Sequence, residues 1–108
     1  MNDLSAFDFE KYQELLGRGL CTGVGTPDGQ MCIEAAVCAA LDLPHGDAPS
    51  CVAVSVRRFK IALNDKNWSS PTARSAGLRD LGIAQIGSAG VVDDVAFVRL
   101  LAERTIRV

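Results

Sequence analysis

Cys32 is the residue whose type and position most directly suggest catalysis. It follows a loop that contains Gly23, Gly25 and Gly29, and it opens an alanine-rich run that predicts a helix over residues 31–43. At the N-terminus of a helix, the dipole and the free N–H groups lower the pKa of a thiol. Cys32 is therefore a candidate nucleophile.

A cysteine nucleophile needs a neighbouring base. His45 is the only histidine in the chain, and Asp47 lies close enough in sequence to orient it. His45 follows the opposite end of the predicted helix, however, and a rise of 1.5 Å per residue separates the two ends by about 16 Å. This separation argues against a Cys32–His45 pair within one subunit, so an enzyme is the less favoured interpretation.

A second group of reactive side chains lies at the far end of the same predicted helix. Cys38, Asp42 and His45 would project from its last turns and the following loop, and Cys51 would be the fourth ligand of a metal site. The four cysteines contain no closely spaced pair of the kind that structural zinc sites use. Reduced, buried cysteines are the competing interpretation, and no cofactor is predicted.

Arginines on two consecutive predicted helices suggest nucleic-acid binding as an alternative function. The helices at 51–64 and 71–86 form a loose helix-turn-helix pair that would present Arg57, Arg74 and Arg79. The connector is longer than the usual turn of this motif. The pI is about 5.2, whereas domains that bind nucleic acids are usually basic.

Five helices are predicted to position these residues. Apolar residues recur at helical spacing over about 7–17, 31–43, 51–64, 71–86 and 94–106. The N-cap candidates are a capping box at residues 5–8, Ser50, Ser70 before Pro71, and Asp93. Glycines around a Pro-Asp turn predict a short β-hairpin or ordered loop near residues 20–31. The predicted fold class is mainly α, a compact bundle of four or five helices.

The same spacing separates buried from exposed positions. Glu34, Cys38 and Asp42 are predicted to share a second face of the helix at 31–43, and Arg57, Arg58 and Lys60 are predicted to face outward on the next helix. Gly77 and Gly82 indicate close packing of the fourth helix. The predicted core is Phe9, Leu16, Ile33, Val37, Leu41, Val56, Phe59, Leu63, Trp68, Leu78, Leu81, Val98 and Ile106.

Composition and charge narrow the class of protein. Of 108 residues, 48% are hydrophobic, which predicts a single domain over residues 1–108. No run approaches the roughly 18 apolar residues of a membrane span, and the acidic N-terminus lacks the pattern of a signal peptide. A cytoplasmic protein without a membrane partner is expected. Acids dominate residues 1–50 and bases dominate 51–108, so the halves would complement each other within one fold or across an oligomer.

Two sets of short motifs in the chain resemble segments of other proteins. CIEAAVCAAL, LPHGD, LNDKNWSS and GLRDLGIAQIGS, within residues 31–88, are similar to segments of a group of small bacterial, phage and metagenomic proteins of unknown function. This similarity implies a mobile-element or environmental origin and assigns no residue a role. GQMCIEAAV, around Cys32, resembles the nucleophile segment of papain-like hydrolases and transglutaminase-like domains.

The last predicted helix indicates the function that we expect. Val95, Val98, Ala102 and Ile106 share one face, and neighbouring apolar residues widen it beyond a single stripe. Such a surface fits a contact with a protein partner or with a second copy. The sequence therefore predicts a small binding or assembly module without catalysis. A nucleic-acid-binding domain and a cysteine-dependent hydrolase or transferase are the alternatives.

Overall fold

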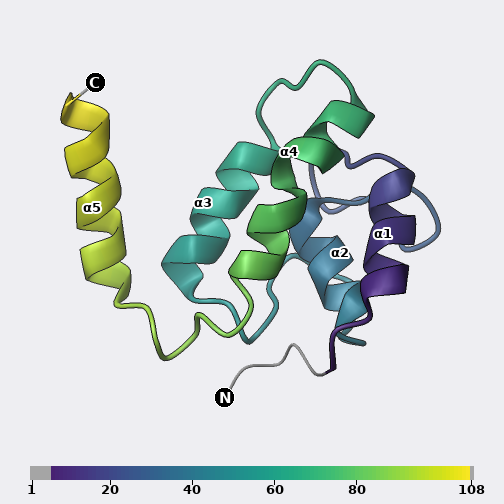
Figure 1. Ribbon diagram of the computed structural model, residues 1–108, viewed down its shortest axis with the longest axis horizontal. Coiled ribbons are helices and arrows are strands. Elements are labelled where there is room, and N and C mark those ends of the chain that lie inside the picture. The colour runs from purple at the N-terminus through teal and green to yellow at the C-terminus, as the bar shows by residue number, and fades with distance from the viewer. Residues whose placement is uncertain (1–5, 108) are drawn as a thin grey trace.

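Five helices form the part of the chain that the structure describes (Figure 1). The computed structural model describes residues 6–107, with side chains described for residues 6–102. The helices are α1 (Phe9–Gly17), α2 (Ile33–Ala40), α3 (Val54–Asn64), α4 (Pro71–Ala84) and α5 (Asp94–Arg107). The mainly α fold class is confirmed. Within the described residues, the hairpin expected near 20–31 reduces to one isolated antiparallel bridge between Gly25 and Met31.

α2 is the helix around which the main body is arranged. α1, α3 and α4 all pack against it, and each residue from Ile33 to Cys38 is buried. Its alanines keep the helix narrow and allow the neighbouring helices to approach closely. α2 is shorter than predicted because Met31 pairs with Gly25 before it. After it, Asp42 adopts a left-handed φ of 60°, a conformation that ends helices.

Side-chain oxygen atoms cap the beginning of α1, α4 and α5. Ser70 accepts a backbone hydrogen bond at the start of α4, with Pro71 in the first turn, as predicted. Asp93 caps α5 in the same way, also as predicted. The cap of α1 is Asp8; Ser5, the other end of the predicted capping box, lies outside the described residues.

The prediction that Ser50 caps the third helix is wrong. α3 begins only at Val54, and its N-cap position is Ala53, whose side chain has no hydrogen-bonding group. The preceding residues form a turn in which the N–H of Val52 donates to the carbonyl of Pro49 over 3.1 Å. The N-terminus of α3 therefore needs a hydrogen-bond acceptor from elsewhere in the chain.

The core confirms part of the predicted list. Leu16, Ile33, Val37, Val56 and Leu78 are buried, and Leu41, Phe59, Leu63 and Trp68 are partly buried. The predictions for Phe9, Leu81 and Val98 are wrong, since these side chains are 47%, 41% and 54% exposed. Phe7, which precedes α1, is buried in place of Phe9. The side chain of Ile106 lies outside the described part.

Two glycines of α4 are packed closely, as predicted. A Cβ atom at Gly77 would overlap the ring of Trp68. One at Gly82 would overlap the hydroxyl of Tyr12 and lie 2.9 Å from the Cδ1 atom of Ile33. The absence of a side chain at both positions lets α4 approach its neighbours.

α5 stands apart from the main body (Figure 1). Among the described helices it packs only against α3. The ring of Phe97 lies edge-on to that of Phe59, with 6.0 Å between the ring centres, and Phe97 packs against a small second core around Val56. None of the helices described over residues 6–107 is long and apolar enough to span a bilayer.

Candidate functional site

Cys32 is a structural cap of α2. Its thiol is buried and lies 3.4 Å from the backbone N–H of Ala35, from which it accepts a hydrogen bond. Burial raises the pKa of the Cys32 thiol to about 11, despite the opposing backbone hydrogen bond. Desolvation of the thiol therefore outweighs the effect of the helix N-terminus, and the pKa of Cys32 is not lowered as the sequence predicted. This environment favours the thiol over the thiolate nucleophile.

The structure does not join His45 to Cys32. The ring of His45 is exposed, and its Nε2 atom lies 3.2 Å from the carbonyl oxygen of Gly25. No hydrogen bond links His45 with Cys32 among the contacts of residues 6–102. The two side chains have separate partners, the N–H of Ala35 for Cys32 and the carbonyl of Gly25 for His45.

The proposed metal ligands do not converge. Cys38 is buried, and desolvation raises the pKa of its thiol to about 11. Cys38 and His45 border one hollow of about 390 Å³, whereas Asp42 borders another hollow with His45. Across residues 6–102, no three His, Cys, Asp or Glu side chains come together in a way that could hold a metal ion.

Arg74 is part of the interior rather than of a basic face. Its guanidinium donates to three carbonyl oxygens, those of Asn64 at 2.7 Å, Leu20 at 3.0 Å and Lys66 at 3.0 Å. The side chain is buried and ties the loop after α1, the end of α3 and the loop after α3 to α4. A nucleic-acid surface could not include it without disrupting these bonds.

The other two arginines have separate environments. Arg79 is exposed and forms an ion pair with its neighbour Asp80 over 3.0 Å. Arg57 is half-buried, on the side of α3 where its charge acts on Glu34. The three arginines therefore differ in exposure, from a buried Arg74 to an exposed Arg79.

A buried polar cluster was missed by the analysis of the sequence. Glu34 has no exposed surface, and its Oε1 atom accepts a hydrogen bond from the Nε2 atom of Gln85. Burial raises the pKa of Glu34 to about 7, with Lys60 and Arg57 opposing the shift. Lys60 is also buried and donates to the carbonyl of Leu81 over 3.0 Å. The prediction that Lys60 faces outward is therefore wrong, and the second face of α2, with Glu34 and Cys38, is buried.

The sequence contains no signal for this cluster. The stripe formed by Glu34 and Cys38 looks solvent-facing at helical spacing, but α2 is surrounded by three helices and has almost no free face. A carboxyl group that titrates near neutral pH is often catalytic. Here a substrate could not reach Glu34, because its side chain is wholly buried.

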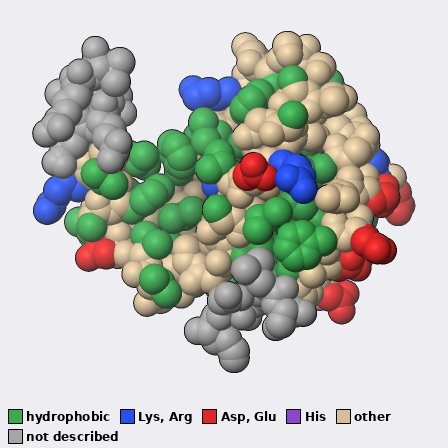
Figure 2. All heavy atoms as spheres, viewed as in Figure 1, with side chains coloured by type: hydrophobic (Ala, Val, Ile, Leu, Met, Phe, Trp, Pro, Cys, Tyr) green, Lys and Arg blue, Asp and Glu red, His purple; other side chains and the backbone are tan. Residues whose placement is uncertain are grey.

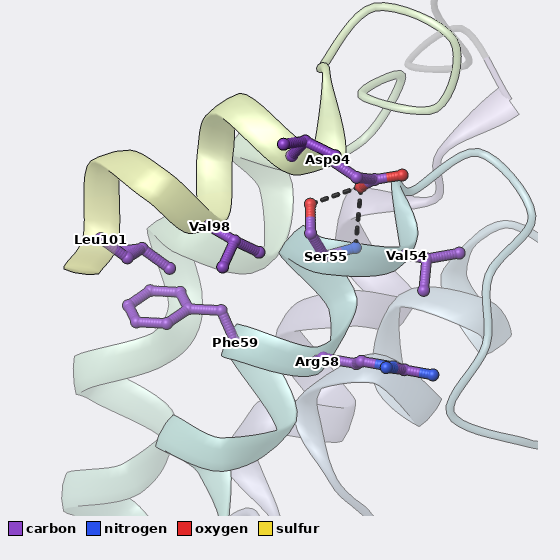
Figure 3. Close-up of a pocket in the computed structure, with 8 residues that line it drawn as sticks. Val54, Ser55, Arg58, Phe59, Asp94, Val98 and Leu101 are labelled. Carbon is purple, nitrogen blue, oxygen red and sulfur yellow. Dashed lines mark hydrogen bonds between the residues drawn. The ribbon is translucent and has the colours of Figure 1, made fainter.

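An apolar groove lies between α3 and α5 (Figure 3). Its volume is about 580 Å³, and it is lined by Val54, Ser55, Arg58, Phe59, Asp94, Val95, Val98 and Leu101. Val95 is 68% exposed although its side chain is apolar. Figure 2 shows hydrophobic side chains gathered over α3 and the neighbouring end of α5.

Two of the three polar residues that line the groove bond to each other, and the third has no ion-pair partner in the described chain. Asp94 accepts hydrogen bonds through its Oδ1 atom from both the backbone N–H of Ser55, at 2.9 Å, and the Ser55 hydroxyl. Figure 3 shows these two bonds at one end of the groove. The ion pairs within residues 6–102 are Glu14–Arg18 and Arg79–Asp80, so the exposed Arg58 has no carboxylate partner in the described chain.

Comparisons with protein-family models, with curated proteins and with solved structures find no match to this chain.

Proposed function

We propose that the protein is a binding module without catalysis, and that the groove between α3 and α5 receives an apolar helical segment of a protein. The observation that carries this proposal is the position of α5. This helix packs only on α3 among the described helices, and it keeps Val95 and Val98 largely exposed. A contiguous apolar surface of this kind is typical of a protein-binding site.

The chemistry of the groove favours a helix over a small polar ligand. Small-molecule sites combine apolar walls with several convergent polar groups. In this groove Ser55 bonds to the Oδ1 atom of Asp94, which leaves Arg58 and the exposed carboxylate of Asp94 as the charged groups that a partner can meet. Helix-in-groove binding needs mainly apolar contacts at intervals along a groove, and Val54, Phe59 and Val98 supply them from two helices.

The catalytic alternative has weaker support. A nucleophile needs an accessible thiolate and a base, but burial raises the pKa of Cys32 and His45 lies against the carbonyl of Gly25. The nucleic-acid alternative loses Arg74, whose guanidinium is occupied by three backbone carbonyls. No contact or surface in the described chain supports either alternative as directly as the exposed groove supports binding.

Site-specific photo-crosslinking in cells tests the proposal. A photoreactive phenylalanine analogue replaces Val98 in the groove, and in a control protein it replaces Gln13, which is exposed on α1 away from the groove. We expect a discrete crosslinked protein product from position 98 and none from position 13. Mass spectrometry of the product then identifies the bound segment. Equal yields from both positions, or no product from position 98, would contradict the proposal.

A further inference from the structure

We propose that the occupant of the α3–α5 groove is a second copy of this chain, related by a two-fold axis so that each α5 lies along the groove of the other copy. This inference rests on the proposed binding function of the groove. It adds the identity of the partner and the contacts that specify it. In such a symmetric interface, a contact from residue i to residue j occurs twice.

The charges at the groove are self-complementary. α3 contributes Arg58 and α5 contributes Asp94, and both line the same groove. They do not pair with each other within one copy. The ion pairs within residues 6–102 are Glu14–Arg18 and Arg79–Asp80. A two-fold axis across the groove would bring Arg58 of each copy to Asp94 of the other, and would therefore form two pairs of opposite charge.

The acidic end of α5 strengthens this complementarity. Asp94 begins α5 and Asp93 caps it, and Arg58 is exposed on α3 at the groove. Opposed α5 helices would place each acidic pair near Arg58 of the other copy. Complementary charges at the edge of an interface fix its register and exclude wrong partners. A partner with no charge of its own would leave Arg58 without such a contact.

The apolar surfaces also match. Val95 and Val98 are separated by one turn of α5 and are 68% and 54% exposed, and Val54 at the start of α3 is 47% exposed. These side chains line the groove. Val95 and Val98 also belong to the face that α5 would offer to a second copy. The same residues therefore form both the receiving surface and the inserted surface, as an isologous interface requires.

Charge reversal tests the second copy directly. Light scattering at high micromolar concentration should find a dimer for the wild-type chain. Arg58→Glu and Asp94→Lys should each place like charges opposite one another twice, and should each weaken dimerisation at least about tenfold. An equimolar mixture of the two variants restores both pairs of opposite charge, so the mixture should form a heterodimer.

Asp94→Lys also removes the acceptor of Ser55, so a second series leaves that contact intact. Arg58→Lys keeps the charge and should remain dimeric, whereas Arg58→Glu should be monomeric with an unchanged circular dichroism spectrum. A wild-type monomer, or an Arg58→Glu dimer as stable as the wild type, would overturn the second-copy proposal. If position 98 then crosslinks to a different protein, the binding function stands and only the identity of the partner is wrong.

Discussion

The carboxylate of Asp94, in the first turn of α5, accepts hydrogen bonds from both the backbone N–H and the hydroxyl of Ser55, in the first turn of α3. One side chain thus replaces the cap that α3 lacks at Ala53. The bonds from Ser55 hold the pKa of Asp94 below its usual range. Because the charge lies near the N-termini of two helices, it also interacts favourably with both dipoles. This contact positions α5, and with it the wall of the groove.

Asp94→Ala should loosen α5 without unfolding the main body. We expect backbone amides of α5 to exchange hydrogen about tenfold faster, because the helix loses its polar contact with α3. Amides of α2 should keep their protection. Hydrogen–deuterium exchange measured by mass spectrometry resolves the two regions. Asp80→Ala, at an exposed carboxylate of α4, is the control, and equal exchange of α5 in both variants would contradict the role of Asp94.

Glu34 should make the fold less stable as pH rises from about 4.5 to about 7. Its pKa is about 7 in the folded state and near its usual 4.5 in an unfolded chain. Between these values the folded state binds more protons than the unfolded state, so the free energy of unfolding falls with rising pH. The loss through Glu34 should be roughly 3 kcal/mol.

Glu34→Gln removes this titration. Urea unfolding, followed by the fluorescence of the single tryptophan, should show that the variant gains stability relative to the wild type between about pH 4.5 and about pH 8. A difference between the two proteins that stays constant over this range would show that Glu34 does not titrate as its burial indicates.

Arg74→Lys should be strongly destabilising although it keeps the charge. A lysine ammonium cannot reproduce the fork that donates to the carbonyls of Leu20, Asn64 and Lys66. Leaving these buried groups unpaired should cost about 2–3 kcal/mol. Arg79→Lys, at an exposed ion pair, should change stability by less than about 0.5 kcal/mol. Thermal unfolding of both variants makes the comparison, and equal losses would contradict the structural role of Arg74.

Gly82→Ala should destabilise the fold despite the higher helix propensity of alanine. The new Cβ atom would overlap the hydroxyl of Tyr12 and press on Ile33. Overpacking of this kind costs about 1–3 kcal/mol, against a gain in propensity of at most about 1 kcal/mol. Gly17→Ala is the matched control, since a Cβ atom there meets nothing within 4 Å. Chemical denaturation should rank Gly82→Ala below the wild type and Gly17→Ala level with it or above.

Local signals in the sequence predict much of the fold. Helical periodicity locates all five helices, and Ser70 and Asp93 show where two of them begin because a side-chain cap is a local interaction. The sequence predicts the start of α3 incorrectly, since its cap comes from Asp94, 39 residues from Ser55. Capping over such a distance leaves no local pattern.

The candidate site is predicted only in part. The width of the apolar surface on the last helix indicates a contact surface, and the groove lies there. The sequence does not show which polar residues are buried, because that depends on how many helices surround α2. Glu34 and Lys60 look like solvent-facing residues at helical spacing, yet both are buried. Arg74 looks like a surface base for the same reason.

The role of the α3–α5 groove is tested most directly by sedimentation velocity on Val98→Asp and Val91→Asp. Val98 lines the groove, whereas Val91 is 78% exposed and does not line it. Both substitutions add the same charge at an exposed valine, so neither should disturb the fold. We predict that the wild type and Val91→Asp sediment as dimers at high micromolar concentration and that Val98→Asp sediments as a monomer. A Val98→Asp variant that associates like the wild type would contradict the role of the groove.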